Sequence, residues 1–159
     1  MEKQVKSQKL KVKSSIIEGI LKELLEHLEV GATFSIEEKE ETFYINLQTD
    51  NPGILIGYHG QTLFALQLIL SLIAYRRIGE WTKIVVDVGD YRQRREETLK
   101  RMAFSVAQKV KFSHQEQELP PMSGAERRII HLALSDDPEV ETESRGEGKE
   151  RRVVVKPRA

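Results

Sequence analysis

The feature that most constrains the fold of this chain is the stretch 54–63, where a short apolar run meets two glycines and then a long helical pattern. Gly57 and Gly60 stand three positions apart. After them, apolar side chains recur at spacings of three and four residues: Leu63, Leu66, Leu70 and Ile73. This spacing predicts a helix over residues 61–76 with one buried face. The stretch therefore predicts two helices joined by a tight turn with a glycine on each side.

The two glycines give this turn a chemical use. Because glycine has no side chain, another molecule can approach the backbone closely at both positions. The helix that starts at Gln61 also presents unpaired N–H groups and the positive end of its dipole, and both favour a phosphate. The same four-residue pattern occurs in plain turns between helices, so the elements around it must decide between the two interpretations.

Composition excludes several classes of protein. The 159 residues suffice for one domain or two small ones, and the absence of cysteine excludes disulfides and thiolate chemistry. A reducing, intracellular setting is compatible with that absence. We expect no membrane insertion, because no apolar run approaches the length of a membrane span and the N-terminus lacks the apolar segment of a signal peptide. The expected location is the cytoplasm.

Charge is balanced overall but unevenly distributed. The formal net charge is zero, which argues against indiscriminate binding to nucleic acid. Residues 31–51 contain one lysine and five acidic residues, whereas residues 91–135 contain nine Lys or Arg and five acidic residues. A local basic surface is therefore expected in the second half of the chain.

The first half of the chain reads as helix, strand, strand, helix, turn, helix, strand. Residues 1–14 are rich in lysine and are expected to be a flexible tail or the end of a linker. Ser15 and Glu18 fit a capping box at the start of the first helix. Alternating apolar residues predict a hairpin over 34–47 and a third strand over 83–88. Three strands with helices on one face form a compact α+β domain.

This order, with Gly57-Tyr58-His59-Gly60 between the two consecutive helices, resembles the type II KH domain. The other KH arrangement starts with a strand and ends with a helix, so the order of elements distinguishes the two. The resemblance implies that the Gly-x-x-Gly turn clamps the backbone of a single-stranded nucleic acid.

The second half of the chain, residues 90–159, predicts another small α+β domain. A helix is expected over 91–112 and a second one over 123–134, where Ser123 and Glu126 fit a capping box. Two strands are expected around a glycine-containing turn at 145–148. On the second helix, Arg127 and His131 stand four positions apart and so share one face. Arginine can bind a phosphate with two hydrogen bonds, and histidine can donate one or stack on a base. The alternative is a surface arginine beside a histidine bonded to the local backbone.

This half resembles the Arg-xxx-His domain, a small module that binds single-stranded nucleic acid. The matching residues are Pro120, Pro121, Met122, Arg127, His131, Thr142, Ser144, Gly146, Gly148 and Arg151. A type II KH domain followed directly by this domain resembles the C-terminal part of the Jag family, also called SpoIIIJ-associated proteins. That resemblance implies a bacterial, cytoplasmic RNA-binding protein linked to cell elongation and envelope growth. It also implies a small single-KH protein as a partner, while the oligomeric state stays open.

The expected boundaries are a tail at 1–14, a type II KH domain at 15–89 and an Arg-xxx-His domain at 90–159. The expected RNA site of the KH domain consists of Leu55, Ile56, Gly57, Tyr58, His59, Gly60, Gln61 and Thr62. That of the second domain consists of Arg127, Arg128, His131, Arg145 and Arg151, with Arg92, Arg94 and Arg95 as auxiliary basic residues.

The chain departs from the family pattern in two ways. The family usually has lysine or arginine between the two glycines, where this chain has Tyr58 and His59. Backbone clamping is compatible with that change, but the electrostatic share of the affinity should fall. The separate N-terminal domain common in the family is also missing from the expected organisation, unless residues 1–14 are the end of a linker to it.

Two other functional classes remain as alternatives. An enzyme is disfavoured, because the four histidines lie on four different elements and the chain has neither an HExxH motif nor a Walker-type loop. We therefore expect no catalysis, no cofactor and no metal. A protein-interaction module or scaffold with minor RNA contacts is the second alternative, and it is compatible with RNA binding.

Overall fold

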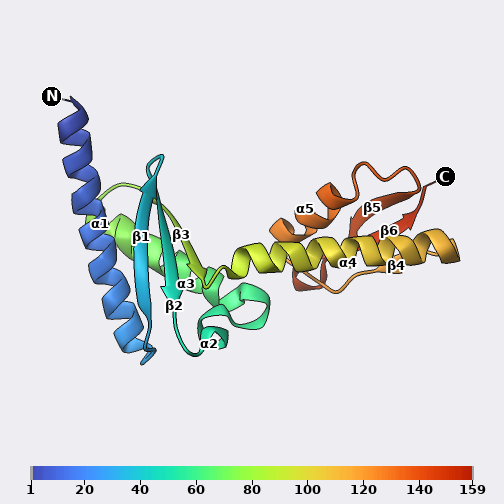
Figure 1. The fold of residues 1–159 in the computed structure, drawn as a ribbon, viewed down its shortest axis with the longest axis horizontal. Helices are drawn as coiled ribbons and strands as arrows, with labels where there is room; N and C mark the ends of the chain where they lie inside the picture. The colour runs from blue at the N-terminus through green and yellow to red at the C-terminus, as the bar shows by residue number, and fades with distance from the viewer. Residues whose placement is uncertain (1, 159) are drawn as a thin grey trace. The chain divides into compact units, whose positions relative to one another are not determined.

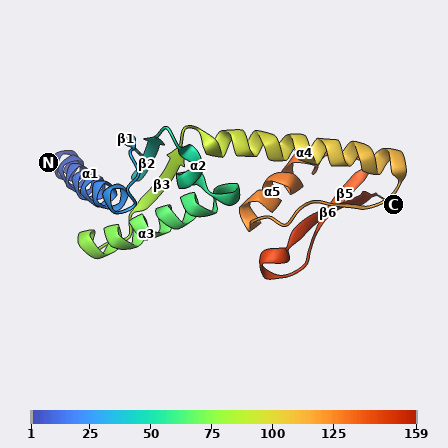
Figure 2. The ribbon, with the colours of Figure 1, turned by 90° about the horizontal axis from the view of Figure 1, so that it is seen from below.

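The computed structural model describes residues 2–158, with side chains from residue 7 onward. It divides into two compact units, one ending at Arg92 and the other starting at Gln93. Each unit has its own hydrophobic core. Figures 1 and 2 show the helices and strands of each unit.

The first unit has the predicted order of elements. They are α1 (Glu2–His27), β1 (Thr33–Lys39), β2 (Thr42–Gln48), α2 (Pro52–Ile56), the 3-10 turn η1 (Tyr58–Gly60), α3 (Gln61–Ile78) and β3 (Lys83–Val88). Antiparallel β1 and β2 are followed by β3, which pairs with β2 in parallel. This is the order expected of a type II KH domain.

The core of the first unit forms between one face of this sheet and the helices α1 and α3, which Figure 2 shows on the same side of the strands. Phe43, Ile45 and Leu47 alternate along β2 and are buried, whereas Tyr44 between them is exposed. This alternation follows from the two-residue period of a strand. Helix α3 contributes the expected buried face, and β3 stays at the edge of the sheet.

The first helix begins earlier than the sequence pattern predicts. Helix α1 starts at Glu2, so the flexible tail expected at residues 2–14 is wrong, and Met1 lies outside the described residues. Leu10 packs against the core, and Lys9 and Lys13 form ion pairs with Glu80. These contacts hold the lysine-rich turns in the helix. Ser15 therefore lies inside α1 and cannot cap its start.

One stretch, Pro52–Ile78, is apolar and long enough by composition to span a membrane, so the expectation that no run approaches that length is wrong. In the structure the stretch is broken at the turn, where Gly57 and His59 have non-helical backbone angles. Its buried residues belong to the core of the first unit: Leu55, Leu63, Leu66, Leu70 and Ala74. The stretch is thus the pair of core helices around the turn.

The second unit contains most of one long helix, a short helix and a three-stranded sheet. The elements are α4 (Tyr91–Ser113), β4 (Gln117–Glu118), α5 (Gly124–Ala133), β5 (Val140–Arg145), the 3-10 turn η2 (Gly148–Glu150) and β6 (Arg152–Pro157). The strand order is β4-β6-β5, and both pairings are antiparallel. Buried side chains of α4, α5 and β6 form its core.

The predicted capping box of α5 is present. The Ser123 hydroxyl accepts from the Glu126 N–H, and the Glu126 carboxylate accepts from the Ser123 N–H at 3.0 Å. Arg95 on α4 donates to the same carboxylate at 2.8 Å. Partial burial raises the pKa of Glu126, but the hydrogen bonds from Ser123 and Arg95 outweigh it and hold the pKa below its usual value. The cap thus also ties α5 to α4.

Candidate nucleic-acid interface

The turn between α2 and α3 depends on its two glycines. Gly57 has φ 69° and ψ −169°, a combination that is essentially restricted to glycine. A Cβ atom there would collide with Oγ1 of Thr62 and would lie 3.0 Å from the Thr62 backbone nitrogen. At Gly60, with φ 83°, a Cβ atom would lie 3.0 Å from the Tyr91 ring. The backbone of the turn therefore stays uncovered by side chains at both positions.

Two aromatic rings lie at the tip of the turn. Tyr58 is 72% exposed, and its ring centroid is 4.1 Å from that of His59, which is also exposed. The tip thus offers ring surface where lysine or arginine was the family expectation. Gln61 and Thr62 begin α3 and are exposed.

The other two residues expected at this site lie deeper. Leu55 is 1% exposed and belongs to the core, so its expected contact with a base is wrong. Ile56 is half-buried and also packs against that core. The apolar run before the turn therefore serves mainly to anchor it.

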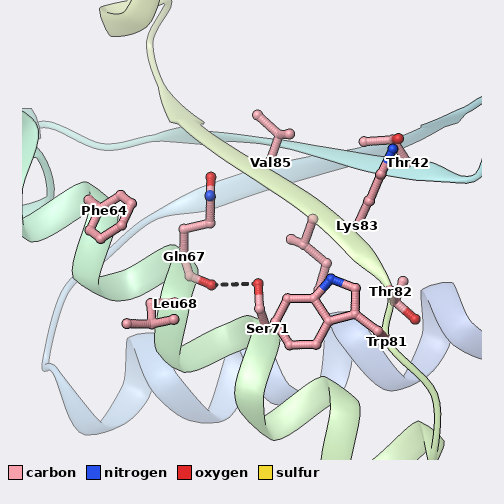
Figure 3. A pocket seen from close by; sticks show the side chains of 10 residues that line it. Thr42, Phe64, Gln67, Leu68, Ser71, Trp81, Thr82, Lys83 and Val85 are labelled. Atoms are coloured by element: carbon pink, nitrogen blue, oxygen red, sulfur yellow. Dashed lines mark hydrogen bonds between the residues drawn. The ribbon is translucent and has the colours of Figure 1, made fainter. Parts of the chain in front are cut away.

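An open groove lies between α3 and β3, in the same unit as the turn (Figure 3). Its apolar walls include Phe64, Leu68 and Trp81, of which Phe64 is 65% and Trp81 60% exposed. Gln67, Ser71 and Lys83 add polar atoms. Its volume is ≈ 240 Å³, below the range of about 300–1,000 Å³ common for small-molecule pockets. Exposed rings beside a few polar groups suit flat, unstacked bases.

The sequence pattern does not reveal this groove. Phe64 and Leu68 fall inside an apolar helical pattern, and such a pattern is read as buried. Trp81 carried a usable signal, since it is the only tryptophan and stands just after Gly79, where α3 ends. An aromatic residue in a short connection is rarely needed by a core, and here its ring lies 6.0 Å from that of Tyr75.

Arg92 lies at this groove and not at the second site. Its Nε donates to the Val86 carbonyl at 2.9 Å, and its Nη2 donates to Gln67 Oε1 at 2.7 Å. Arg95 is paired with Glu126 at the cap of α5, whereas Arg94 is exposed. The three auxiliary arginines therefore do not form one basic cluster.

The Arg127–His131 pair is engaged inside the second unit. Arg127 Nη1 donates to the Met122 carbonyl at 2.9 Å. The His131 ring bonds two hydroxyl groups of β5, with Nδ1 2.6 Å from Thr142 Oγ1 and Nε2 2.9 Å from Ser144 Oγ. Burial, and then the positive charge of Arg127, lower the pKa of His131. His131 is therefore a tie between α5 and β5.

The remaining predicted cations differ in availability. Arg145 binds both carboxylate oxygens of Glu116, at 2.9 and 3.1 Å, and also contacts Glu143. Arg128 and Arg151 are exposed, and neither side chain has a hydrogen bond or ion pair to the residues that the structure describes. These two are the predicted cations most accessible to a ligand.

Comparison with known proteins matches both units. Residues 14–88 match the KH domain of KhpA/KhpB, and residues 97–157 match the family of Arg-xxx-His domains. The type II KH domain and the Arg-xxx-His domain expected from the sequence are therefore confirmed, as is the α+β class.

Curated relatives share this pair of domains. RNA-binding protein KhpB of Clostridium symbiosum is 39% identical over 137 residues, which cover 85% of this chain and 62% of that protein. RNA-binding protein KhpB of Lactiplantibacillus plantarum is 36% identical, covering 83% and 41%. That of Bacillus subtilis is 34% identical, covering 76% and 59%. The chain spans about half the length of the curated relatives it matches. With its KH domain followed by an Arg-xxx-His domain, this chain belongs to the Jag family, whose matching relatives are named RNA-binding protein KhpB.

Proposed function

We propose that this chain is a non-catalytic protein that binds single-stranded RNA through both of its domains. The observation that carries the proposal is the turn at Gly57 and Gly60, with an exposed apolar groove in the same unit. The name of the relatives supports RNA as the ligand. The family resemblance adds a cytoplasmic location and a link to cell elongation and envelope growth, which we include in the proposal.

The KH turn supplies the phosphate contact. Gly60, the residue before α3, makes no side-chain cap, so the first N–H groups of α3 are not covered by a capping side chain. These N–H groups and the helix dipole attract a phosphate oxygen. Tyr58 and His59 then offer ring faces beside the backbone, and Phe64 and Trp81 offer ring faces to the bases. Stacking thereby replaces part of the charge that the turn lacks.

The second domain supplies the exposed cations. Arg128 and Arg151 are free to meet phosphates, whereas Arg127 and His131 hold α5 in place through Met122, Thr142 and Ser144. We therefore assign the direct contacts to Arg128 and Arg151. Arg127 and His131 act by positioning them.

Strand state tests the proposal. Because the groove takes unstacked bases, single-stranded RNA should bind more tightly than a duplex of the same sequence. Filter binding with matched single- and double-stranded oligomers measures this. Equal or tighter binding of the duplex would contradict the proposed function.

A protein-interaction role is the second candidate, and the outer face of α3 favours it. Ile69, Leu72 and Tyr75 are about half exposed on an already apolar helix. The occupant suggested by the family resemblance is a small single-KH protein. Copurification that survives nuclease treatment and high salt, and that a Leu72→Asp variant loses, would support this role. Loss of the complex on nuclease treatment alone would contradict it.

A further inference from the structure

Gln67 is the polar side chain at the centre of the groove, and its amide is held from two sides. Figure 3 shows it on α3 between Phe64 and Ser71, with the side chain extending toward β3. Its Oε1 accepts from the Val86 N–H at 3.0 Å and from Arg92 Nη2 at 2.7 Å. Arg92 is itself fixed by its bond to the Val86 carbonyl. Gln67 is therefore pinned to the edge strand of the sheet.

The chemistry of the partners fixes which way the amide faces. A backbone N–H and a guanidinium can only donate hydrogen bonds, so the atom that meets them must be the amide oxygen. A flipped amide would place its NH₂ against two donors. The Nε2 group has no hydrogen bond to the residues that the structure describes. Gln67 thus offers the groove an oriented donor and no acceptor.

We propose that Gln67 sets the base preference of the KH groove, favouring bases with a carbonyl oxygen and disfavouring adenine. This inference rests on the proposed function and names the determinant within the same site. Uracil, cytosine and guanine each carry a carbonyl oxygen that can accept from the Gln67 NH₂. Adenine has none, and its exocyclic amino group is a donor where uracil presents O4. Two donors facing one another leave both unpaired, which costs affinity in a partly dry site.

The neighbouring polar residue provides a matched control. Ser71 also lines the groove, but its hydroxyl donates to the Gln67 backbone carbonyl at 2.7 Å. It is 8% exposed, so its hydroxyl is committed inside the helix. A Ser71→Ala change should leave base preference unaltered, whereas changes at Gln67 should not.

The test compares oligo(U) and oligo(A) of eight nucleotides, with fluorescence anisotropy on the whole chain. Wild-type protein should bind oligo(U) about two- to tenfold more tightly, the equivalent of one hydrogen bond. Gln67→Glu keeps an oxygen for Val86 and Arg92 but presents an acceptor to the groove, so it should reduce or reverse that ratio. Gln67→Met removes the donor without adding an acceptor and should bring the ratio toward one. Because oligo(A) stacks on itself, the change in ratio between variants is the decisive quantity.

The outcomes separate this inference from the function beneath it. Failure of the wild-type chain to bind either oligomer would overturn the proposed function and this inference together. Binding of both oligomers with the same ratio in wild type, Gln67→Glu and Gln67→Met would overturn the role of Gln67 alone. Thermal melts show whether each variant folds, and the wild-type preference for oligo(U) needs no variant. A wild type that prefers oligo(A) would also overturn the inference.

Discussion

Gly57 has a backbone conformation that side-chain-bearing residues rarely adopt, and its surroundings leave no room for a side chain. The obstacle includes the backbone nitrogen of Thr62, which cannot move away as a flexible side chain could. The shape of the turn therefore depends on this one residue. The identity of its neighbours Tyr58 and His59 is much freer, since both are exposed.

Replacing Gly57 with alanine should destabilise the first domain. Backbone strain alone costs about 1–3 kcal/mol, and the contact with Thr62 adds to it. Gly53→Ala is the matched control, because nothing lies within 4 Å of a Cβ there and the residue is helical. That change should be neutral or stabilising by about 0.5–1 kcal/mol. Urea unfolding measures both, and equal stability of the two variants would contradict this account of the turn.

His131 makes the stability of the second domain depend on pH. Burial and the charge of Arg127 lower its pKa from 6.5. The unfolded chain therefore takes up the proton at a higher pH than the folded chain, so acidification favours unfolding. Stability should be full above about pH 6.5 and should fall as the pH drops below it.

A His131→Gln variant should lose that dependence. Glutamine can still bond Thr142 and Ser144 but does not titrate. Melts of both proteins between about pH 7.5 and 5.5 avoid the range in which the carboxylates titrate. The other three histidines are present in both proteins, so they cancel in the difference. Parallel pH profiles for the two proteins would show that His131 is not the group responsible.

At the scale of single elements, α5 depends on its first turn. The helix spans only Gly124–Ala133, and helices of this length are marginal without packing or caps. Ser123 caps its N-terminus, and Glu126 joins the cap to Arg95 on α4. The position of Arg127 and Arg128 therefore depends on this cap.

Ser123→Ala should destabilise the second domain by about 0.5–2 kcal/mol, because one N–H of the first turn loses its acceptor. Ser105→Ala is the control: this residue is exposed in the middle of α4, where alanine is the better helix former. Denaturant unfolding of each variant measures the difference. A Ser123→Ala protein as stable as Ser105→Ala would mean that packing alone holds α5.

Elements were more predictable than contacts. The order of helices and strands in the first domain and the cap of α5 followed from period and capping chemistry, which are local properties. The Arg145–Glu116 pair joins residues 29 positions apart, and no local pattern indicates it. The His131 tie carried a partial signal, because Thr142 and Ser144 alternate on one face of a strand. Helix α3 hid its groove because it is apolar on its exposed side as well.

At the scale of the whole molecule, two modest sites on one chain can bind a long RNA more tightly than either alone. Tethering raises the effective concentration of the second site once the first is occupied. The zero net charge and the non-basic turn make each site weak by itself. Affinity should therefore depend on oligomer length more than on any single contact.

Two double variants test this linkage. Tyr58→Asp with His59→Asp places negative charge at the turn, and Arg128→Ala with Arg151→Ala removes exposed cations from the second domain; all four side chains are exposed, so the folds should persist. On a long oligomer both variants should bind more weakly, because each loses the gain from linkage. On an oligomer of about four nucleotides, the span of a KH turn, only the turn variant should lose affinity. Titrations against both lengths, with circular dichroism melts as the folding control, give the comparison. If the arginine variant keeps full affinity for the long oligomer, the second domain has a role other than RNA binding.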